Sequence, residues 1–146
     1  MKKYEFTGET KEIRLLFRTA TLHRIRATVA FGIVEVGDLG GWIEKEENLS
    51  HEGKAWVWGN AKVCGDAEVF SASHVLVIGA IGSRNDFTTF YRDKDNEITV
   101  KCGCFLGKID RFLEKVTQTH GDSKYALVYR AAVEVAKLQI ELTERK

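Results

Sequence analysis

The sequence predicts an α+β fold in which a short left-handed β-helix of hexapeptide repeats joins a β-rich N-terminal part to a C-terminal β-hairpin and two helices. Three observations lead to this expectation: a six-residue repeat in mid-chain, alternation of apolar and polar residues on both sides of it, and helical periodicity near the end. The 146 residues, 44% of them hydrophobic, suffice for one core without a disulfide or a metal. We expect a single domain whose successive parts are residues 1–53, 54–80, 81–107 and 108–146.

The N-terminal part, residues 1–53, is expected to supply strands that cap the repeat. Residues 19–27 and residues 31–36 each alternate well enough to form a strand. The glycine-rich segment 37–43, GDLGGWI, then leads the chain into the first coil.

The central part, residues 54–80, repeats with a period of six. In a hexapeptide β-solenoid one recurring position fills the interior, a small residue keeps the corner tight, and Gly-Asn or Gly-Asp pairs supply the positive φ of the turns. A meander of two or three strands is the alternative. Four hexads make little more than one coil, so the flanking parts must cap both ends. The recurring residues are Val57, Val63, Val69 and Val75, and, two positions before each, Ala55, Ala61, Ala67 and Ser73.

The C-terminal parts predict a hairpin and two helices. Residues 87–92 and 97–105 flank the polar run DKDN and form the hairpin. The first helix spans about 108–119 and stops near Gly121. The second helix begins at a cap, Asp122 or Ser123, and its apolar arc is wide enough to be covered on two sides, by the domain itself or by a second copy. That arc comprises the stripe Tyr125, Val128, Ala132, Val135, Leu138 and Leu142, broadened by Leu127, Ala131 and Ile140.

Composition and charge exclude several classes of protein. Lys and Arg total 22 against 21 for Asp and Glu, so the formal charge of +1 carries no strong signal for nucleic-acid binding. No segment has the composition of a membrane span, and the start of the chain, MKKYEF, lacks the apolar run of a signal peptide. Three cysteines cannot all pair within one chain. We expect a cytoplasmic protein that does not contact membranes.

The pair Cys102 and Cys104 raises the question of a metal site. Their spacing is shorter than the usual zinc spacing, and no second ligand pair exists in the sequence. On one strand both side chains would point to the same face, in phase with Ile98 and Val100. We interpret them as small core residues, with Gly103 allowing close approach of a neighbouring segment, and expect neither metal nor cofactor.

Residues 79–86, GAIGSRND, contain the candidate ligand-binding residues Ser83, Arg84 and Asn85. Backbone N–H groups exposed at the glycines, together with a forked guanidinium, suit a phosphate or a carboxylate. Arg24 and Arg26, on one face of the upstream strand, would add positive charge to the same ligand. The alternatives are a simple exit loop and a solvated strand face.

Trp56 and Trp58 flank Val57, so both should point outward from the solenoid, with His74 and Leu76 stacked beneath them. A soluble monomer seldom leaves such residues bare. Either the C-terminal helices cover them, or they form an oligomer interface or a partner surface. We expect a homo-oligomer.

The chain resembles a family of proteins encoded by bacteriophages and prophages of gut and related bacteria, whose members usually carry many G-N/D-A-x-V hexads between similar flanks. The resemblance implies a phage accessory protein in the host bacterial cytoplasm and brings no known catalytic residues. By analogy with other phage proteins of this size, it implies interference with a host pathway such as a defence system, in the manner of anti-CRISPR proteins, by binding a host protein or sequestering a small anionic, nucleotide-like ligand. The motifs that carry the resemblance are residues 21–27 and 37–69, Gly82-Ser83-Arg84, residues 88–90 and 102–107, and His120-Gly121-Asp122.

Two other functions follow from the repeat. The first is a structural protein that assembles by stacking solenoid ends. The second is an enzyme like the hexapeptide-repeat acyltransferases, in which His51 or His74 would act as the base. Four hexads are short for the stacked coils with which those enzymes bind their acyl carrier. The leading expectation is therefore a non-enzymatic binding protein.

Overall fold

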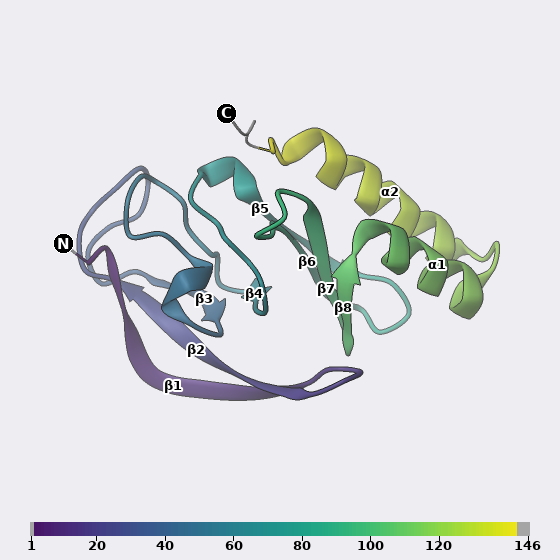
Figure 1. The fold of residues 1–146 in the computed structure, drawn as a ribbon, viewed down its shortest axis with the longest axis horizontal. Helices are drawn as coiled ribbons and strands as arrows, with labels where there is room; N and C mark the ends of the chain where they lie inside the picture. Colours follow the sequence, from purple (N-terminus) through teal and green to yellow (C-terminus); the bar gives the residue numbers. More distant parts are fainter. Residues whose placement is uncertain (1, 143–146) are drawn as a thin grey trace.

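Two four-stranded sheets and a pair of helices make up the computed structural model, which describes residues 2–142 (Figure 1). One sheet has the strand order β1-β2-β3-β4 and the other β5-β6-β7-β8. The strands are β1 (Tyr4–Arg14), β2 (Thr19–Ala27), β3 (Leu39–Ile43), β4 (Lys62–Val63), β5 (Val75–Ile81), β6 (Asp86–Arg92), β7 (Ile98–Cys102) and β8 (Phe105–Lys108), and the helices are α1 (Ile109–His120) and α2 (Lys124–Gln139).

The first sheet is mixed. Strands β1, β2 and β3 pair antiparallel, whereas β3 and β4 pair parallel. The predicted strand at 19–27 is confirmed as β2, but β1 was not predicted. Gly8, at φ 97°, lies in a register shift that breaks the alternation of β1. The predicted strand at 31–36 is wrong: Gly32, at φ 55°, turns the chain, and the segment forms only an isolated bridge from Phe31 to Val34.

The repeat residues converge into the first core, as their period predicts. All six valines and alanines named below are buried, together with Tyr4 and Ile43 of the first sheet. Gly41 allows this packing because a Cβ there would lie 2.2 Å from the carbonyl oxygen of Trp58. The inward positions are Val57, Val63, Val69, Ala55, Ala61 and Ala67.

The predicted left-handed β-helix is nevertheless wrong. Among residues 2–142, parallel pairing is limited to β3 with β4 and a single bridge from Leu49 to Val69. Within the third hexad, Ala67 already forms an antiparallel bridge with Asp93. Beyond Val69 the chain leaves the repeat, and Val75 enters the second sheet opposite Tyr91. The backbone of the fourth hexad is thus satisfied by an antiparallel hairpin partner instead of a preceding coil, and the result is an α+β fold with two sheets.

The second sheet is an antiparallel meander, and both helices pack on one of its faces (Figure 1). The predicted hairpin is confirmed as β6 and β7, and the first predicted helix as α1. The predicted strand 97–105 is interrupted, because β7 ends at Cys102 and Gly103, at φ 56°, turns the chain into β8. Cys102 and Cys104 therefore do not share one strand.

Helix α2 buries a different face from the one predicted. Its inward residues are Ala126, Tyr129, Val133 and Ala136, which pack in the second core with Phe112 of α1. Of the predicted arc, Ala132 and Ile140 are buried in this core as well. The predicted stripe points mostly to solvent because the sheet and α1 occupy the other side of the helix. Its exposed members are Tyr125, Val135, Leu138 and Leu142, beside which Leu127 is also exposed.

Candidate functional site

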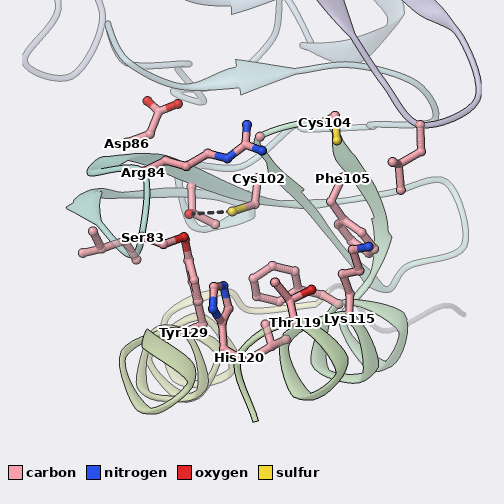
Figure 2. Close-up of a pocket in the computed structure, with 16 residues that line it drawn as sticks. Ser83, Arg84, Asp86, Cys102, Cys104, Phe105, Lys115, Thr119, His120 and Tyr129 are labelled. Carbon is pink, nitrogen blue, oxygen red and sulfur yellow. Dashed lines mark hydrogen bonds between the residues drawn. The ribbon is translucent and has the colours of Figure 1, made fainter. Parts of the chain in front are cut away.

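A pocket of about 220 Å³ opens where the helix-facing side of the second sheet meets α1 and α2. Figure 2 shows its walls: the β5–β6 turn carries Ser83 and Arg84, the β7–β8 turn carries Cys104, and the helices supply His120 and Tyr129. The tip of the β1–β2 hairpin reaches the same place, because the Leu16 N–H donates to the Cys104 carbonyl at 3.0 Å. Three distant parts of the chain therefore form one site.

Aromatic rings make the apolar wall of the pocket. The Phe112 ring lies 5.4 Å from that of Phe105 and 5.7 Å from that of Tyr129, centroid to centroid. His120 stacks on Tyr129 at 5.7 Å with 28° between the planes. Phe112 and Tyr129 are themselves buried in the second core, whereas Phe105 and His120 are half-buried. Together the four rings give this side of the pocket an aromatic lining, which suits a ligand with a flat ring.

Hydroxyl and thiol groups line the inner end. Thr88 donates to the Cys102 sulfur at 3.5 Å. Burial, and next the neighbouring Cys102, raises the pKa of Tyr129, so its hydroxyl remains a proton donor at neutral pH. Gly82 makes room for that hydroxyl, because a Cβ at this position would lie 1.9 Å from the Tyr129 oxygen.

Two cationic side chains, those of Arg84 and Lys115, line the pocket. Arg84 is exposed in the β5–β6 turn, and its guanidinium passes close to Gly103, where an added Cβ would lie 3.6 Å from it. Lys115 projects from α1 on the other side (Figure 2). Within residues 2–142, neither forms an ion pair with a carboxylate, although Asp86 also lines the pocket. Their charges are available to an anionic group.

The structure brings together only part of the predicted anion site. Ser83 and Arg84 line the pocket, whereas Asn85 stays in the turn at φ 50° with its N–H on the Gly82 carbonyl. Arg24 and Arg26 lie in the first sheet, away from this pocket.

Both of these arginines have acidic partners. Arg26 donates two hydrogen bonds to Glu5, and Arg24 lies 3.5 Å from Glu9. The strand pairing explains the first contact, because Glu5 is directly opposite Arg26 across β1 and β2.

Gly79 and Gly82, whose backbone N–H groups were predicted to be exposed to an anion, are instead packed against side chains. Gly79 lies inside β5, where a Cβ would come within 2.4 Å of the Phe87 ring, and Gly82 makes the contact with Tyr129. Both positions are small because side chains pack directly against the backbone.

The prediction that Trp56 points outward is wrong. Its side chain is only 2% exposed and meets the Phe31 ring edge to face at 5.3 Å, because the 28–38 loop covers that side of the core. Trp58 is 47% exposed, as predicted. His74 and Leu76 do not stack beneath the tryptophans: His74 is buried next to Phe70, and Leu76 packs against the second core.

The two histidines considered as catalytic bases serve the fold. His51 stacks on Tyr4 at 4.0 Å, and its Nδ1 accepts the Lys3 N–H. The Nδ1 of His74 accepts the Phe70 N–H, and burial lowers the pKa of this imidazole. Both acceptor nitrogens are thus used by backbone donors.

Cys102 and Cys104 are half-buried and both line the pocket. Cys102 also packs against the second core, in keeping with the interpretation from the sequence, whereas Cys104 belongs to the β7–β8 turn. Across residues 2–142, no three His, Cys, Asp or Glu side chains gather as a metal site.

Sequence reasoning missed most of the pocket. The unpredicted residues lie on the β1–β2 loop, β8, α1 and α2, and the sequence pattern explained those of α1 only as parts of an amphipathic helix. One signal was available: Gly82, Gly103 and Gly121 each follow a strand or a helix directly and take positive φ, so they mark the turns around the site. The missed residues are Leu16, Phe105, Phe112, Lys115, Thr119, His120 and Tyr129.

Comparison with models of protein families gives no match, and comparison with curated proteins gives none either. In the described part of the chain, no helix is long and apolar enough to cross a membrane.

Proposed function

We propose that this protein is a non-enzymatic binding protein that sequesters a small anionic ligand with a flat ring in the pocket between the second sheet and the helices. One observation carries the proposal: two cations without acidic partners, Arg84 and Lys115, stand beside a wall of aromatic rings. A guanidinium binds phosphate or carboxylate through two parallel hydrogen bonds, and the aromatic wall stacks on a ring.

The size of the pocket limits the ligand. Drug-sized ligands occupy pockets of roughly 300–1,000 Å³, so the volume of about 220 Å³ suits one ring system. The charged group then lies outside, at the exposed Arg84. A nucleoside phosphate has this combination of parts.

The resemblance of the sequence motifs to those of phage and prophage proteins suggests a setting for this activity. A phage accessory protein that removes a nucleotide-like signal would interfere with a host pathway, and a defence system that uses such signals is the target we propose. This setting is an analogy at the level of the family and assigns no residue.

A host protein is the second candidate ligand. Large apolar side chains are exposed at Ile33 and Val36, between β2 and β3, and at Leu39, the first residue of β3. Trp58 is exposed as well. Exposed tryptophan is common in binding hot spots. Capture of one host protein by the wild type but not by Trp58→Glu would favour this candidate.

The two solenoid-based functions receive no support. Stacking of coil ends and binding of an acyl carrier along coils both need a β-helix, and the strands form two sheets instead.

A calorimetric titration tests the pocket. The probes are nucleoside monophosphates of the four common bases and their cyclic forms. Two reference compounds each lack one part of a nucleotide: adenosine lacks the charged phosphate, and inorganic phosphate lacks the ring. We expect at least one nucleotide to bind, and both reference compounds to bind more weakly by about tenfold or more. Arg84→Ala should weaken nucleotide binding by about tenfold or more, because a charge-assisted contact contributes about 1.5–3 kcal/mol.

Arg111→Ala is the matched control, since Arg111 is exposed on α1 and does not line the pocket. It should leave binding unchanged, and Arg84→Lys should restore little, since an ammonium lacks the fork. If no nucleotide binds, or if Arg84→Ala lowers the melting temperature while binding per folded molecule stays the same, the proposal is wrong.

A further inference from the structure

Four basic residues gather on the side of the second sheet that faces away from the pocket, where it meets the first sheet. They are Lys11 of β1, Arg24 of β2, Lys62 of β4 and Lys101 of β7. We refer to them as the basic row. None of them lines the pocket described above.

The first three residues of the basic row are brought together by strand pairing and by the indole ring of Trp42. Arg24 pairs with Trp42 across β2 and β3, and Trp42 pairs with Lys62 across β3 and β4, so the three side chains share one face. The Lys11 ammonium lies 4.4 Å from the centre of the Trp42 ring, and the Arg24 guanidinium 5.7 Å from it. Trp42 therefore holds two cations by its π face.

Lys101 joins them through the contact between the sheets. The Lys62 N–H donates to Thr89 Oγ1 at 3.0 Å, so Thr89 of β6 points toward β4. Lys101 pairs with Thr89 across β6 and β7 and consequently lies on the same face. It is only 5% exposed, and its ammonium donates to the Gly103 carbonyl.

The basic row has little compensating negative charge. Arg24 approaches Glu9 at 3.5 Å, but no carboxylate in residues 2–142 lies within ion-pair distance of Lys11, Lys62 or Lys101. The cations repel one another: burial first and then Lys62 lower the pKa of both Lys11 and Lys101. Weaker effects oppose this shift, from Glu9 and Asp86 at Lys11 and from Cys64, Cys102 and Asp86 at Lys101. An anion placed among them would remove this repulsion.

We propose that the basic row binds a chain of linked phosphates, as found in inorganic polyphosphate or the triphosphate of a nucleotide. Strands lie about 4.8 Å apart, so the step from β2 to β4 alone covers about 10 Å, which is more than one phosphate group spans. Ammonium groups act as point charges toward phosphate and need no planar partner. The row lies on the opposite face of the second sheet from the aromatic wall of the pocket, and the two sites meet at Gly103, which lines the pocket and accepts a hydrogen bond from Lys101.

Calorimetry with inorganic tripolyphosphate, orthophosphate and a short single-stranded oligonucleotide tests this proposal. We expect tripolyphosphate to bind at least about tenfold more tightly than orthophosphate, and the affinity to fall with added salt. Lys11→Gln and Lys62→Gln should each weaken it by about five- to tenfold. Both side chains reach solvent, so these variants should fold, whereas the buried Lys101 is left unchanged.

Lys54→Gln and Arg111→Ala are the controls. Both residues are exposed and lie outside the row and outside the pocket, so neither change should alter tripolyphosphate binding. Absence of tripolyphosphate binding, equal loss with Lys54→Gln, or binding of the oligonucleotide alone would overturn the proposal. If only Arg84→Ala weakens tripolyphosphate binding, the phosphates bind in the pocket and not at the basic row. The two proposals can therefore be overturned independently of each other.

Discussion

Glu44 shows how one side chain ties three segments together. Its carboxylate accepts both ends of the Arg18 guanidinium, at 2.7 and 3.0 Å, and the Gly65 N–H at 2.8 Å. Arg18 lies between β1 and β2, and Gly65 follows β4. The hydrogen bond from Arg18, opposed by burial, lowers the pKa of Glu44.

A lowered pKa makes this contribution depend on pH with a definite sign. The stabilisation is complete above the unfolded pKa of Glu, about 4.3, and is lost as the pH falls through the lower pKa of the folded protein. Glu44→Gln should therefore reduce the free energy of unfolding by about 1–2 kcal/mol at pH 7, and the difference from wild type should shrink toward pH 3.

Urea denaturation at both pH values measures this difference. Glu12→Gln is the control, because Glu12 is exposed on β1, and it should have little effect at either pH. A Glu44→Gln deficit that stays the same at pH 3 would show that the carboxylate charge is not what stabilises the fold.

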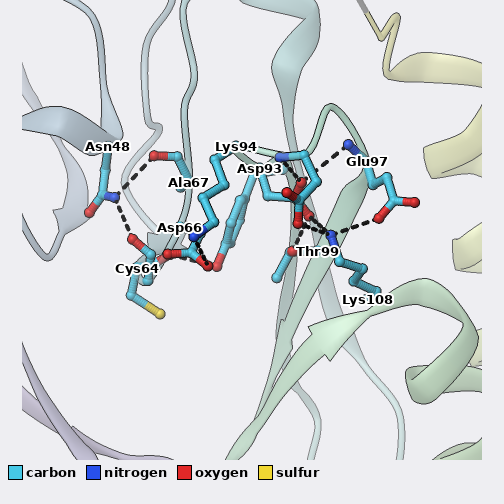
Figure 3. A network of polar contacts seen from close by, with 12 residues as sticks. Asn48, Cys64, Asp66, Ala67, Asp93, Lys94, Glu97, Thr99 and Lys108 are labelled. Carbon is cyan, nitrogen blue, oxygen red and sulfur yellow. Dashed lines mark hydrogen bonds and ion pairs between the residues drawn. The ribbon is translucent and has the colours of Figure 1, made fainter.

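At the level of elements, the β6–β7 turn is joined to β8 and α1 through one ammonium group. Figure 3 shows Lys108 beside Asp93, Glu97 and Thr99. The Lys108 nitrogen lies 3.0 Å from Asp93, 2.9 Å from Asp95 and 2.7 Å from Glu97. Burial opposes its charge, but the hydrogen bonds to these carboxylates raise its pKa above the ordinary range, so the ammonium is charged throughout the physiological range.

Lys108→Met should lower the free energy of unfolding by about 1–3 kcal/mol, because it leaves the buried Asp93 carboxylate without its cation. Chemical denaturation at neutral pH measures the change. Lys54→Met, at an exposed lysine, is the control. Equal losses in the two variants would mean that the ammonium does not join these elements.

For the whole molecule, the exposed face of α2 supports our proposal of a homo-oligomer. Leu138 is 86% exposed and Leu127 61%, and Ala131 and Val135 lie near them on the same face. Residues 128, 131, 135 and 138 of α2 follow the alternating three- and four-residue spacing of a helix–helix seam. A two-fold axis would bury this face against its own copy, and a net charge of +1 sets up little repulsion between copies.

Leu138→Glu should shift the protein toward monomer, because two carboxylates would meet at the paired helices. Sedimentation velocity at high micromolar concentration measures the shift. Gln118→Glu, on the exposed side of α1, adds the same charge elsewhere and should leave the assembly intact. A wild-type protein that sediments as a monomer at this concentration contradicts the proposal.

The candidate site could be predicted only where its residues are neighbours in the chain. Ser83 and Arg84 stand together in a turn marked by Gly82, and both line the pocket. Phe112 comes from α1, whose periodicity explains it as a core residue, and Tyr129 comes from α2 but lies outside the stripe that the periodicity of that helix predicts. The basic row is likewise assembled by strand register and sheet contact, which composition and local pattern do not report.

The sequence by itself determined which repeat positions are hidden from water, where β2, the β6–β7 hairpin and α1 lie, and where the chain turns. These are local properties, set by side-chain periodicity and backbone preference. Only the tertiary structure decided that the backbone after Val69 pairs with a hairpin instead of another coil, and which apolar face of α2 is buried. Periodicity and hydrophobicity indicate that a residue is buried, but they do not indicate which residues cover it. Many different neighbours could do so, and the need to satisfy the hydrogen bonds of the whole backbone selects among them.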